Sequence, residues 1–177
     1  MVFLEVELKA KVNVPPNRLK SLDISLRKHL TIQLLFKVGL WKASMKHGYY
    51  VSPTILNNFD NDGTNMLTHE IIFKVSFNCT TMKPCKGEIL IGIVDKIMIH
   101  GMFLKSGPMQ NIFLSEKKMK DYKFRTAEQP VFMNMNRGGS MQKGTKVRFK
   151  VFAVKWIEGE KDFHILATIE ANYLGPI

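Results

Sequence analysis

Three cations alternate with apolar residues on a predicted strand near the end of the chain. Lys146, Arg148 and Lys150 share one face of residues 146–156, and valine and phenylalanine side chains share the other. A row of cations can follow a phosphate backbone, and Phe152 on the same face can stack a base. The pattern indicates contact with single-stranded nucleic acid, and an ordinary solvated strand face explains it equally well.

The overall charge also favours a polyanionic partner. The 177 residues include 26 basic and 15 acidic side chains, a formal net charge of +11 and a pI of about 9.7. Residues 82–177 are more basic than residues 1–81. Nucleic acid is the usual partner of a protein with a positive electrostatic field. The alternative is that the charge only keeps the protein soluble.

The sequence lacks the residue patterns of the common catalytic and metal sites. It contains no GxxxxGK[ST], GxSxG or HExxH motif, and its five histidines are scattered without ligand spacing. Cys79 and Cys85 are expected to be reduced thiols, because the chain is expected to stay in a reducing compartment. Two cysteines without a paired histidine cluster also make a zinc site improbable. We therefore expect no catalytic residue, no metal and no cofactor.

Two groups of elements must position the candidate residues. In the first half, residues 5–14 alternate as a strand, Pro15-Pro16 ends it, and Asn17 is the predicted N-cap of the next helix. That helix runs from Arg18 to about Gly39 with a stripe of leucines facing a sheet and its basic residues facing water. Strands follow at 49–56 and 69–77, with a turn predicted at Asn57–Gly63. The leucines of the stripe are Leu19, Leu22, Leu26, Leu30 and Leu34.

The second half reads as short strands only. They are expected at 86–100, 101–107, 111–114, 146–156 and 163–170. Five short strands in about ninety residues suggest a small closed barrel, because closure removes unpaired edges. The fold of Glu116–Gly144, which is rich in lysine, stays open at this point. The prediction is an α+β chain with an N-terminal domain at 1–81 and a C-terminal barrel domain at 82–177.

Part of the second half resembles the opening of an S1 domain, a family of the OB-fold type. The resemblance lies in a glycine-started strand at 86–100, the corner His100-Gly101-x-Phe103, and the element at 110–115. It implies that His100, Phe103 and Phe113 occupy the positions where S1 domains stack bases. The first of these is usually aromatic, and the acidic residue usual on the later strand is replaced by Lys155.

The chain as a whole resembles the subunit 7 family of nuclear RNA polymerases and the archaeal counterpart of that family. The resemblance is collinear over both halves and extends to plant forms, including those of polymerases IV and V. The first half matches at Met1–Val14, Gly48-Tyr49-Tyr50-Val51 with Thr54, and Phe73-Lys74-Val75. The second half matches at Lys86-Gly87-Glu88, His100-Gly101, Gly107-Pro108-Met109 and Tyr173-Leu174-Gly175. The plant-like stretches are Tyr122-Lys123-Phe124, Pro130–Asn134 and Val154-Lys155-Trp156.

This resemblance implies a non-catalytic stalk subunit in the nucleus. No membrane segment is expected, because no apolar run approaches the roughly 20 residues needed to span a bilayer. A truncated RNP-like domain would plug into the polymerase core, which includes the largest subunit. The smaller subunit 4 would pack along the joint of the two domains as a heterodimer partner, and the S1 barrel would hold the emerging RNA. The expected core contacts are Pro15, Pro16, Asn17, Asn61 and Gly63, and the expected RNA contacts are His100, Phe103, Lys105, Phe113, Lys146, Arg148, Lys150 and Lys155.

Two other functions remain compatible with the sequence. One is a free-standing S1 protein of translation or RNA decay, which the barrel alone would support but which leaves the first half unexplained. The other is a structural module whose OB-like surface binds protein and whose charge is incidental. RNA affinity and its salt dependence separate these alternatives.

Overall fold

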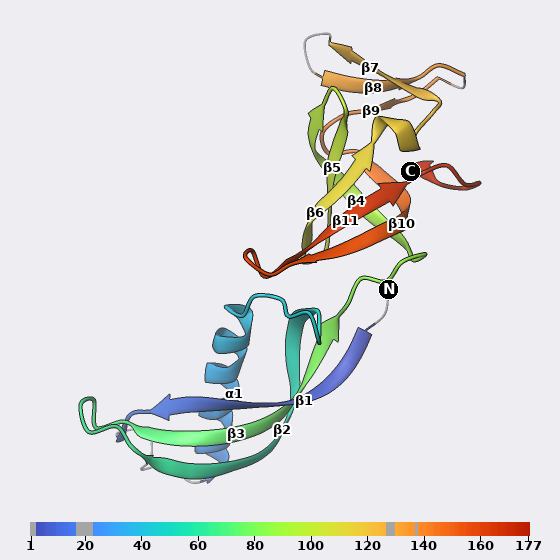
Figure 1. Ribbon diagram of the computed structural model, residues 1–177. Coiled ribbons are helices and arrows are strands. Elements are labelled where there is room, and N and C mark those ends of the chain that lie inside the picture. The colour runs from blue at the N-terminus through green and yellow to red at the C-terminus, as the bar shows by residue number, and fades with distance from the viewer. Residues whose placement is uncertain (1–2, 17–22, 127–129, 137) are drawn as a thin grey trace. The chain divides into compact units, whose positions relative to one another are not determined.

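A computed structural model describes residues 3–16, 23–126, 130–136 and 138–177, and Figure 1 shows its elements. The described residues are mostly β with one α-helix. They divide into two compact units, Phe3–Lys83 and Pro84–Ile177. Each unit is described by itself below.

The N-terminal unit is a three-stranded antiparallel sheet covered by a helix. Its elements are β1 (Phe3–Val14), α1 (Asp23–Gly39), β2 (Tyr49–Thr64) and β3 (Ile71–Met82), and the strand order is β1-β3-β2. The predicted alternation of the first strand is confirmed, because Val12 and Val14 are buried while Lys11 and Asn13 are exposed. Phe77, fully buried on the central strand β3, packs in the core beneath α1.

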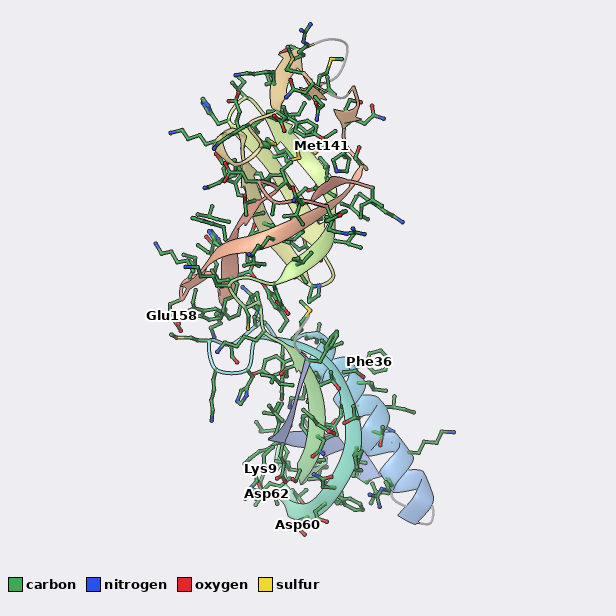
Figure 2. All side chains as sticks on the ribbon, turned by 90° about the vertical axis from the view of Figure 1, so that its right-hand side faces the viewer. Lys9, Phe36, Asp60, Asp62, Met141 and Glu158 are labelled. Carbon is green, nitrogen blue, oxygen red and sulfur yellow. The ribbon has the colours of Figure 1, made fainter. Side chains whose placement is uncertain are left out.

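The helix packs through part of the predicted leucine stripe. Leu30 and Leu34 are buried in the core cluster, and Leu26 packs against it. The outward face is not purely charged, because Phe36 is 70% exposed and points away from the sheet (Figure 2). Leu19, Leu22 and the predicted cap Asn17 lie outside the described residues. The other exposed apolar residues of this region are Ile32, Leu35 and Leu40.

The predicted turn at Asn57–Gly63 is wrong, because β2 continues to Thr64 and the reversal is made by the residues after it. Asp60 and Asn61 pair with Lys74 and Phe73 of β3, and irregularities in the register absorb the extra residues. The turn lies at Asn65–Glu70, where the Asn65 amide donates to the Glu70 carbonyl at 2.8 Å. Phe59 explains why β2 does not turn here. Its ring packs against that of Phe73, with centroids 6.1 Å apart, and holds the strand to the sheet.

In the C-terminal unit, five strands close into a ring. They are β4 (Ile89–Met98), β5 (Gly101–Ser106), β6 (Met109–Ser115), β10 (Lys146–Ile157) and β11 (Asp162–Thr168). They pair in the order β11-β6-β5-β4-β10, and the β10–β11 pairing closes the ring. These five elements match the five strands expected from the sequence. The interior is filled by fully buried side chains, among them Phe149, Leu104, Ile112 and Met102.

The lysine-rich segment between β6 and β10 folds as a small sheet at one end of the barrel (Figure 1). After the short 3₁₀ helix η2 (Glu116–Lys118) come β7 (Tyr122–Thr126), β8 (Pro130–Asn134) and β9 (Ser140–Met141), paired in that order. Buried Phe132 and Met141 anchor this sheet. The last strand, β12 (Gly175–Pro176), pairs with β10.

Neither cysteine forms a disulfide in the part of the chain that is described. Cys79 is buried, and burial raises the pKa of its thiol.

Within the described ranges, no helix is both long enough and apolar enough to cross a membrane.

Candidate nucleic-acid interface

Phe103 and Phe113 form a pair of rings on the outer face of the barrel. They are register partners on the neighbouring strands β5 and β6. Their ring centroids lie 5.1 Å apart at an interplanar angle of 50°, and both side chains are half-buried. Alternation fixes their direction, because their strand neighbours Met102 and Leu114 are fully buried inside the barrel. Two of the three predicted stacking residues are therefore side by side.

Gly101 makes room for this pair. A Cβ atom at Gly101 would lie 2.8 Å from Cζ of Phe113 and 2.3 Å from the Leu114 carbonyl oxygen, and the residue has a φ of +153°. The preceding His100 is exposed in the turn between β4 and β5, and its carbonyl accepts a 3.0 Å hydrogen bond from the Glu116 amide. The predicted His100-Gly101-x-Phe103 corner therefore places an exposed histidine in the turn that leads into β5.

Strand pairing extends the pair into a row that the sequence did not reveal. Lys96 of β4 is the register partner of Phe103, and Leu166 of β11 is the register partner of Phe113. Lys96 and Leu166 are both exposed. We call these four residues the aromatic row: Lys96, Phe103, Phe113 and Leu166. It offers two aromatic faces, an aliphatic side chain and a cation, which suits a base and its phosphate.

The predicted cations nearest the aromatic row are Lys105 and Lys155. Lys105 follows Phe103 on the same face of β5, and its ammonium forms a 3.1 Å ion pair with Asp95. Lys155 of β10 pairs in register with His164, which precedes Leu166 on the same face of β11. Lys155 forms no ion pair among the described residues, so its charge is available to a phosphate.

The cation stripe on β10 lies beside β4 rather than beside the aromatic pair. Lys146, Arg148 and Lys150 are the register partners of three residues of β4 that separate them from β5. Phe152, expected to continue the stripe, sits instead at an irregularity in the β10–β11 register. The ammonium of Lys118 lies 4.5 Å from the Phe152 ring centroid. The predicted RNA residues therefore form two groups on the barrel wall, which meet at Ile93, the register partner of both Lys146 and Lys105.

The predicted core-contact residues that are described gather at one end of the N-terminal sheet. Val14 and Thr64 both pair with Ile71 of β3, so the neighbouring Pro15 and Gly63 lie at the same end. The side chain of Asn61 accepts a 2.8 Å hydrogen bond from the Gly63 amide. Pro16 is exposed, and Asn17 lies outside the described residues.

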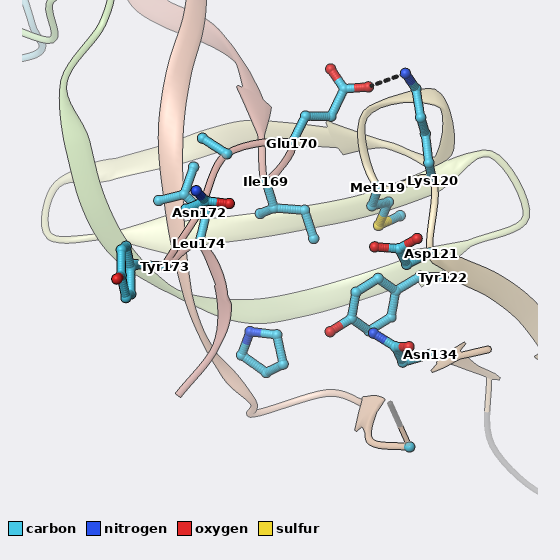
Figure 3. A pocket seen from close by; sticks show the side chains of 13 residues that line it. Met119, Lys120, Asp121, Tyr122, Asn134, Ile169, Glu170, Asn172, Tyr173 and Leu174 are labelled. Atoms are coloured by element: carbon cyan, nitrogen blue, oxygen red, sulfur yellow. Dashed lines mark ion pairs between the residues drawn. The ribbon is translucent and has the colours of Figure 1, made fainter. Parts of the chain in front are cut away.

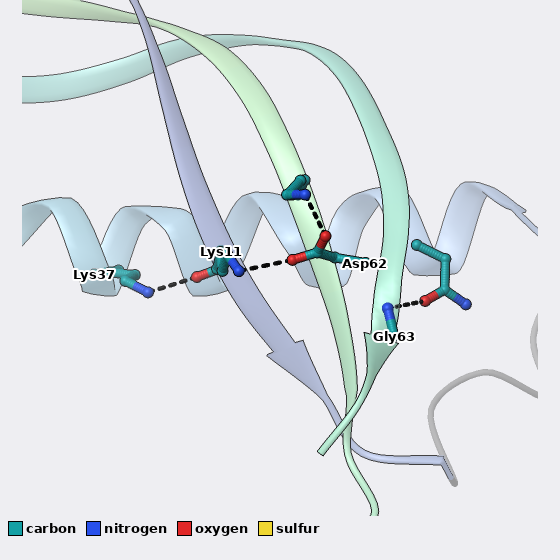
Figure 4. A network of polar contacts seen from close by, with 6 residues as sticks. Lys11, Lys37, Asp62 and Gly63 are labelled. Atoms are coloured by element: carbon teal, nitrogen blue, oxygen red, sulfur yellow. Dashed lines mark hydrogen bonds and ion pairs between the residues drawn. The ribbon is translucent and has the colours of Figure 1, made fainter.

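A polar network joins the three strands at this end (Figure 4). Asp62 of β2 forms a 2.8 Å ion pair with Lys11 of β1 and a second ion pair with Lys74 of β3. Hydrogen bonds from Lys11 and then Lys74 lower the pKa of the Asp62 carboxyl from its ordinary value. Lys37 of α1 donates to the Lys11 carbonyl and ties the helix to the same strand.

A polar pocket of about 700 Å³ lies in the C-terminal unit, between Met119–Tyr122, the end of β8 and the last residues of the chain. In Figure 3, Glu170 and Lys120 face each other across its rim, joined by an ion pair. Hydrogen bonds from Lys118 and, more weakly, Lys120 lower the pKa of Glu170. None of the predicted RNA or core contacts lines this pocket. Within the described part of the chain, no group of histidine, cysteine and carboxylate side chains could hold a metal ion.

Comparisons with known proteins give the chain its family. No family model matches it. The chain is 38% identical to DNA-directed RNA polymerase V subunit 7 of Arabidopsis thaliana, over 99% of this chain and 98% of that one. It is 41% identical to RNA polymerase IV subunit 7 of the same plant, over 99% of both chains. It is 28% identical to the RNA polymerase II subunit RPB7 of Glycine max, over 99% of this chain and 97% of that one.

Among solved structures, an exosome complex RNA-binding protein covers 54% of this chain with a TM-score of 0.37 and 20% identity, a likeness too low to define a fold. The curated relatives carry the assignment, because their identity extends along both chains from end to end. The chain belongs to the subunit 7 family of DNA-directed RNA polymerases and is similar to its plant forms.

Proposed function

We propose that this chain is the stalk subunit of a plant nuclear RNA polymerase, that it pairs with subunit 4, and that it binds the emerging single-stranded RNA through its barrel. The identity of about two residues in five to the subunits of polymerases V and IV supports those two enzymes over polymerase II. A role in RNA-directed silencing would follow from that assignment. Subunit 7 is itself non-catalytic, so the chain contributes binding rather than chemistry.

The pair of rings on the barrel is the observation that carries the RNA-binding part of the proposal. Phe103 and Phe113 are half-buried side by side on a fully paired wall, and the exposed His100 lies in the turn before β5. Stacking on such rings tolerates any base, which suits a subunit that meets transcripts of every sequence. Lys105 and Lys155 flank the rings, and the β10 cations add long-range attraction to RNA.

The closed five-stranded ring supports assignment of residues 82–177 to the OB-fold type, in which a partly open Greek-key barrel binds nucleic acid on one wall. The N-terminal unit, with one helix on a three-stranded sheet, is proposed to be the truncated RNP-like domain that contacts the core. Pro15, Pro16, Asn17, Asn61 and Gly63 are the proposed contact residues. This assignment is supported by the position of Pro15 and Gly63 at the same end of the sheet.

Affinity isolation of the tagged chain from plant nuclear extract tests the assembly. Mass spectrometry should recover two very large polymerase subunits and a small subunit 4 partner, and the identity of the largest subunit names the polymerase. An extract without nuclei should yield none of them. Recovery of ribosomal or RNA-decay factors instead, or of no large subunit, would contradict the proposal and favour a free-standing RNA-binding protein.

A further inference from the structure

The outer face of β4 carries three isoleucines in a row. Ile89, Ile91 and Ile93 are 57%, 52% and 48% exposed, and they alternate with residues that point into the barrel. The water-facing side of a strand is ordinarily polar, so half-exposed branched apolar side chains at three successive outward positions form a contiguous apolar patch. Such a patch, rimmed by polar groups, marks an interaction surface.

The three isoleucines are matched one for one by the cations of β10. Ile89 pairs in register with Lys150, Ile91 with Arg148, and Ile93 with Lys146. Lys146 and Lys150 form no ion pair or side-chain hydrogen bond among the described residues, and Arg148 donates only to the Tyr173 carbonyl, at 3.5 Å. We call these six residues the isoleucine–cation face: Ile89, Ile91, Ile93, Lys146, Arg148 and Lys150.

The pairing of β4 restricts what can bind there. Both edges of β4 are occupied, by β5 and by β10, so an added strand would find no free backbone groups. An occupant must therefore contact side chains alone. Outward residues on a strand repeat about every 6.8 Å, and residues four apart on a helix repeat about every 6 Å. An amphipathic helix lying along β4 can place one apolar residue on each isoleucine.

The cations of the isoleucine–cation face determine which residues must flank the apolar stripe of that helix. Three cations on one side, without an acidic partner in the described chain, call for carboxylates along one flank of the occupant. RNA fits less well, because bases stack on aromatic rings and the stripe here is aliphatic. We infer that the isoleucine–cation face docks an amphipathic helix of another protein, with an apolar stripe and an acidic flank. This inference rests on the proposed place of the chain in an assembled polymerase.

A photo-crosslinking residue at Ile91 tests the inference in the assembled enzyme. The full chain would carry p-benzoylphenylalanine in place of Ile91, and a control chain would carry it in place of Glu158, in the β10–β11 turn (Figure 2). Co-purification with the largest polymerase subunit is scored first, and its failure would count against the proposed function and this inference together. In co-purified enzyme, we expect the Ile91 adduct to be a helical protein segment with an acidic flank. An RNA adduct, a segment of another pattern, or a yield no higher than that of the control would overturn the inference alone.

Binding of the full chain to a synthetic peptide of the crosslinked segment supplies the second measurement. Ile89→Thr/Ile91→Thr/Ile93→Thr, which keeps β-branched residues on the strand, should weaken peptide binding at least about tenfold. Lys146→Gln/Lys150→Gln, or replacement of the peptide's acidic residues by amides, should also weaken it. Affinity of the threonine variant for an oligouridylate of about twelve nucleotides should change less than about twofold. Unchanged peptide affinity in the threonine variant, or a parallel loss of RNA affinity, would contradict a protein-docking face.

Discussion

At the scale of single residues, the RNA-binding proposal depends on two rings. Phe103→Leu and Phe113→Leu keep an apolar side chain but remove the flat face that a base stacks on. Each should weaken binding of single-stranded RNA by about 1–3 kcal/mol, measured by fluorescence anisotropy. Phe36→Leu, at an exposed phenylalanine of the N-terminal unit, is the matched control. If both barrel variants bound RNA as tightly as the Phe36→Leu control, the two barrel rings would serve only packing.

Gly101 should tolerate no side chain, because its Cβ would meet both the Leu114 carbonyl and the Phe113 ring. Gly101→Ala should destabilise the barrel by about 1–3 kcal/mol and displace the Phe113 ring. Thermal unfolding measures the first effect and RNA affinity the second. Gly159→Ala is the control, since a Cβ there meets nothing within 4 Å. Equal melting temperatures for the two variants would show that the corner yields more easily than its contacts suggest.

The residues of the aromatic row differ in how far the sequence can reveal them. Phe103 and Phe113, like His100 in the preceding turn, are predictable because their spacing matches a family motif. No sequence motif marks Lys96 or Leu166, because only the strand register places them beside Phe103 and Phe113. The Lys96–Phe103 pairing follows from the position of the turn between β4 and β5, and the register shifts just beyond it, between Val94 and Lys96. The cation stripe of the isoleucine–cation face can be predicted from the sequence. The isoleucines that lie beside it cannot, because their place there depends on the β4–β10 register.

At the scale of elements, the three strands of the N-terminal sheet are joined at one end through Asp62. Asp62→Asn should destabilise this unit at neutral pH, because Lys11 and Lys74 lose their carboxylate. The folded-state pKa is depressed below the ordinary value of 3.8, so the stabilisation is present above that pH and is lost as the pH falls through the folded value. The difference in urea midpoint between wild type and variant should therefore close in acid.

Asp60→Asn is the matched control for this prediction, because Asp60 lies on the same strand and forms no ion pair among the described residues. It should leave the urea midpoint nearly unchanged at every pH. High salt should shrink the Asp62→Asn effect, since both lysines are largely exposed and the pairs are screened. A variant effect that persists unchanged in acid would show that Asp62 acts through packing or the β2 irregularity rather than through charge.

Elements with clear periodicity are predictable from the sequence, and both the wrong turn and the segment left open have physical causes. Residues 5–14 alternate cleanly and the five barrel strands are separated by turn-forming residues, and the structure confirms these elements. The turn predicted at Asn57–Gly63 is wrong because turn-forming residues there are absorbed by irregular pairing with β3, held by Phe59 and Asp62. The small sheet β7–β9 is not predicted, because lysine and arginine are frequent in and around its strands. Its anchors, Phe132 and Met141, lie far enough apart in sequence to give no pattern.

At the scale of the whole molecule, net charge and local charge have different consequences. A net charge of +11 attracts any RNA, but only cations that contact phosphates release counterions. In the proposed interface those are Lys96 and Lys155, neither of which forms an ion pair among the described residues. Lys105 contributes less, because Asp95 already neutralises it in part.

The salt dependence of RNA binding tests this division. The logarithm of affinity should fall linearly with the logarithm of salt concentration, with a slope of about −0.7 for each phosphate neutralised. Lys96→Gln/Lys155→Gln should make the slope shallower by up to about 1.4, since two contacts are lost. Lys9→Gln/Lys28→Gln removes the same net charge from the N-terminal unit and should leave the slope unchanged. If both double variants reduced the slope equally, RNA would be responding to the overall charge of the subunit, and the aromatic row would not be its binding site.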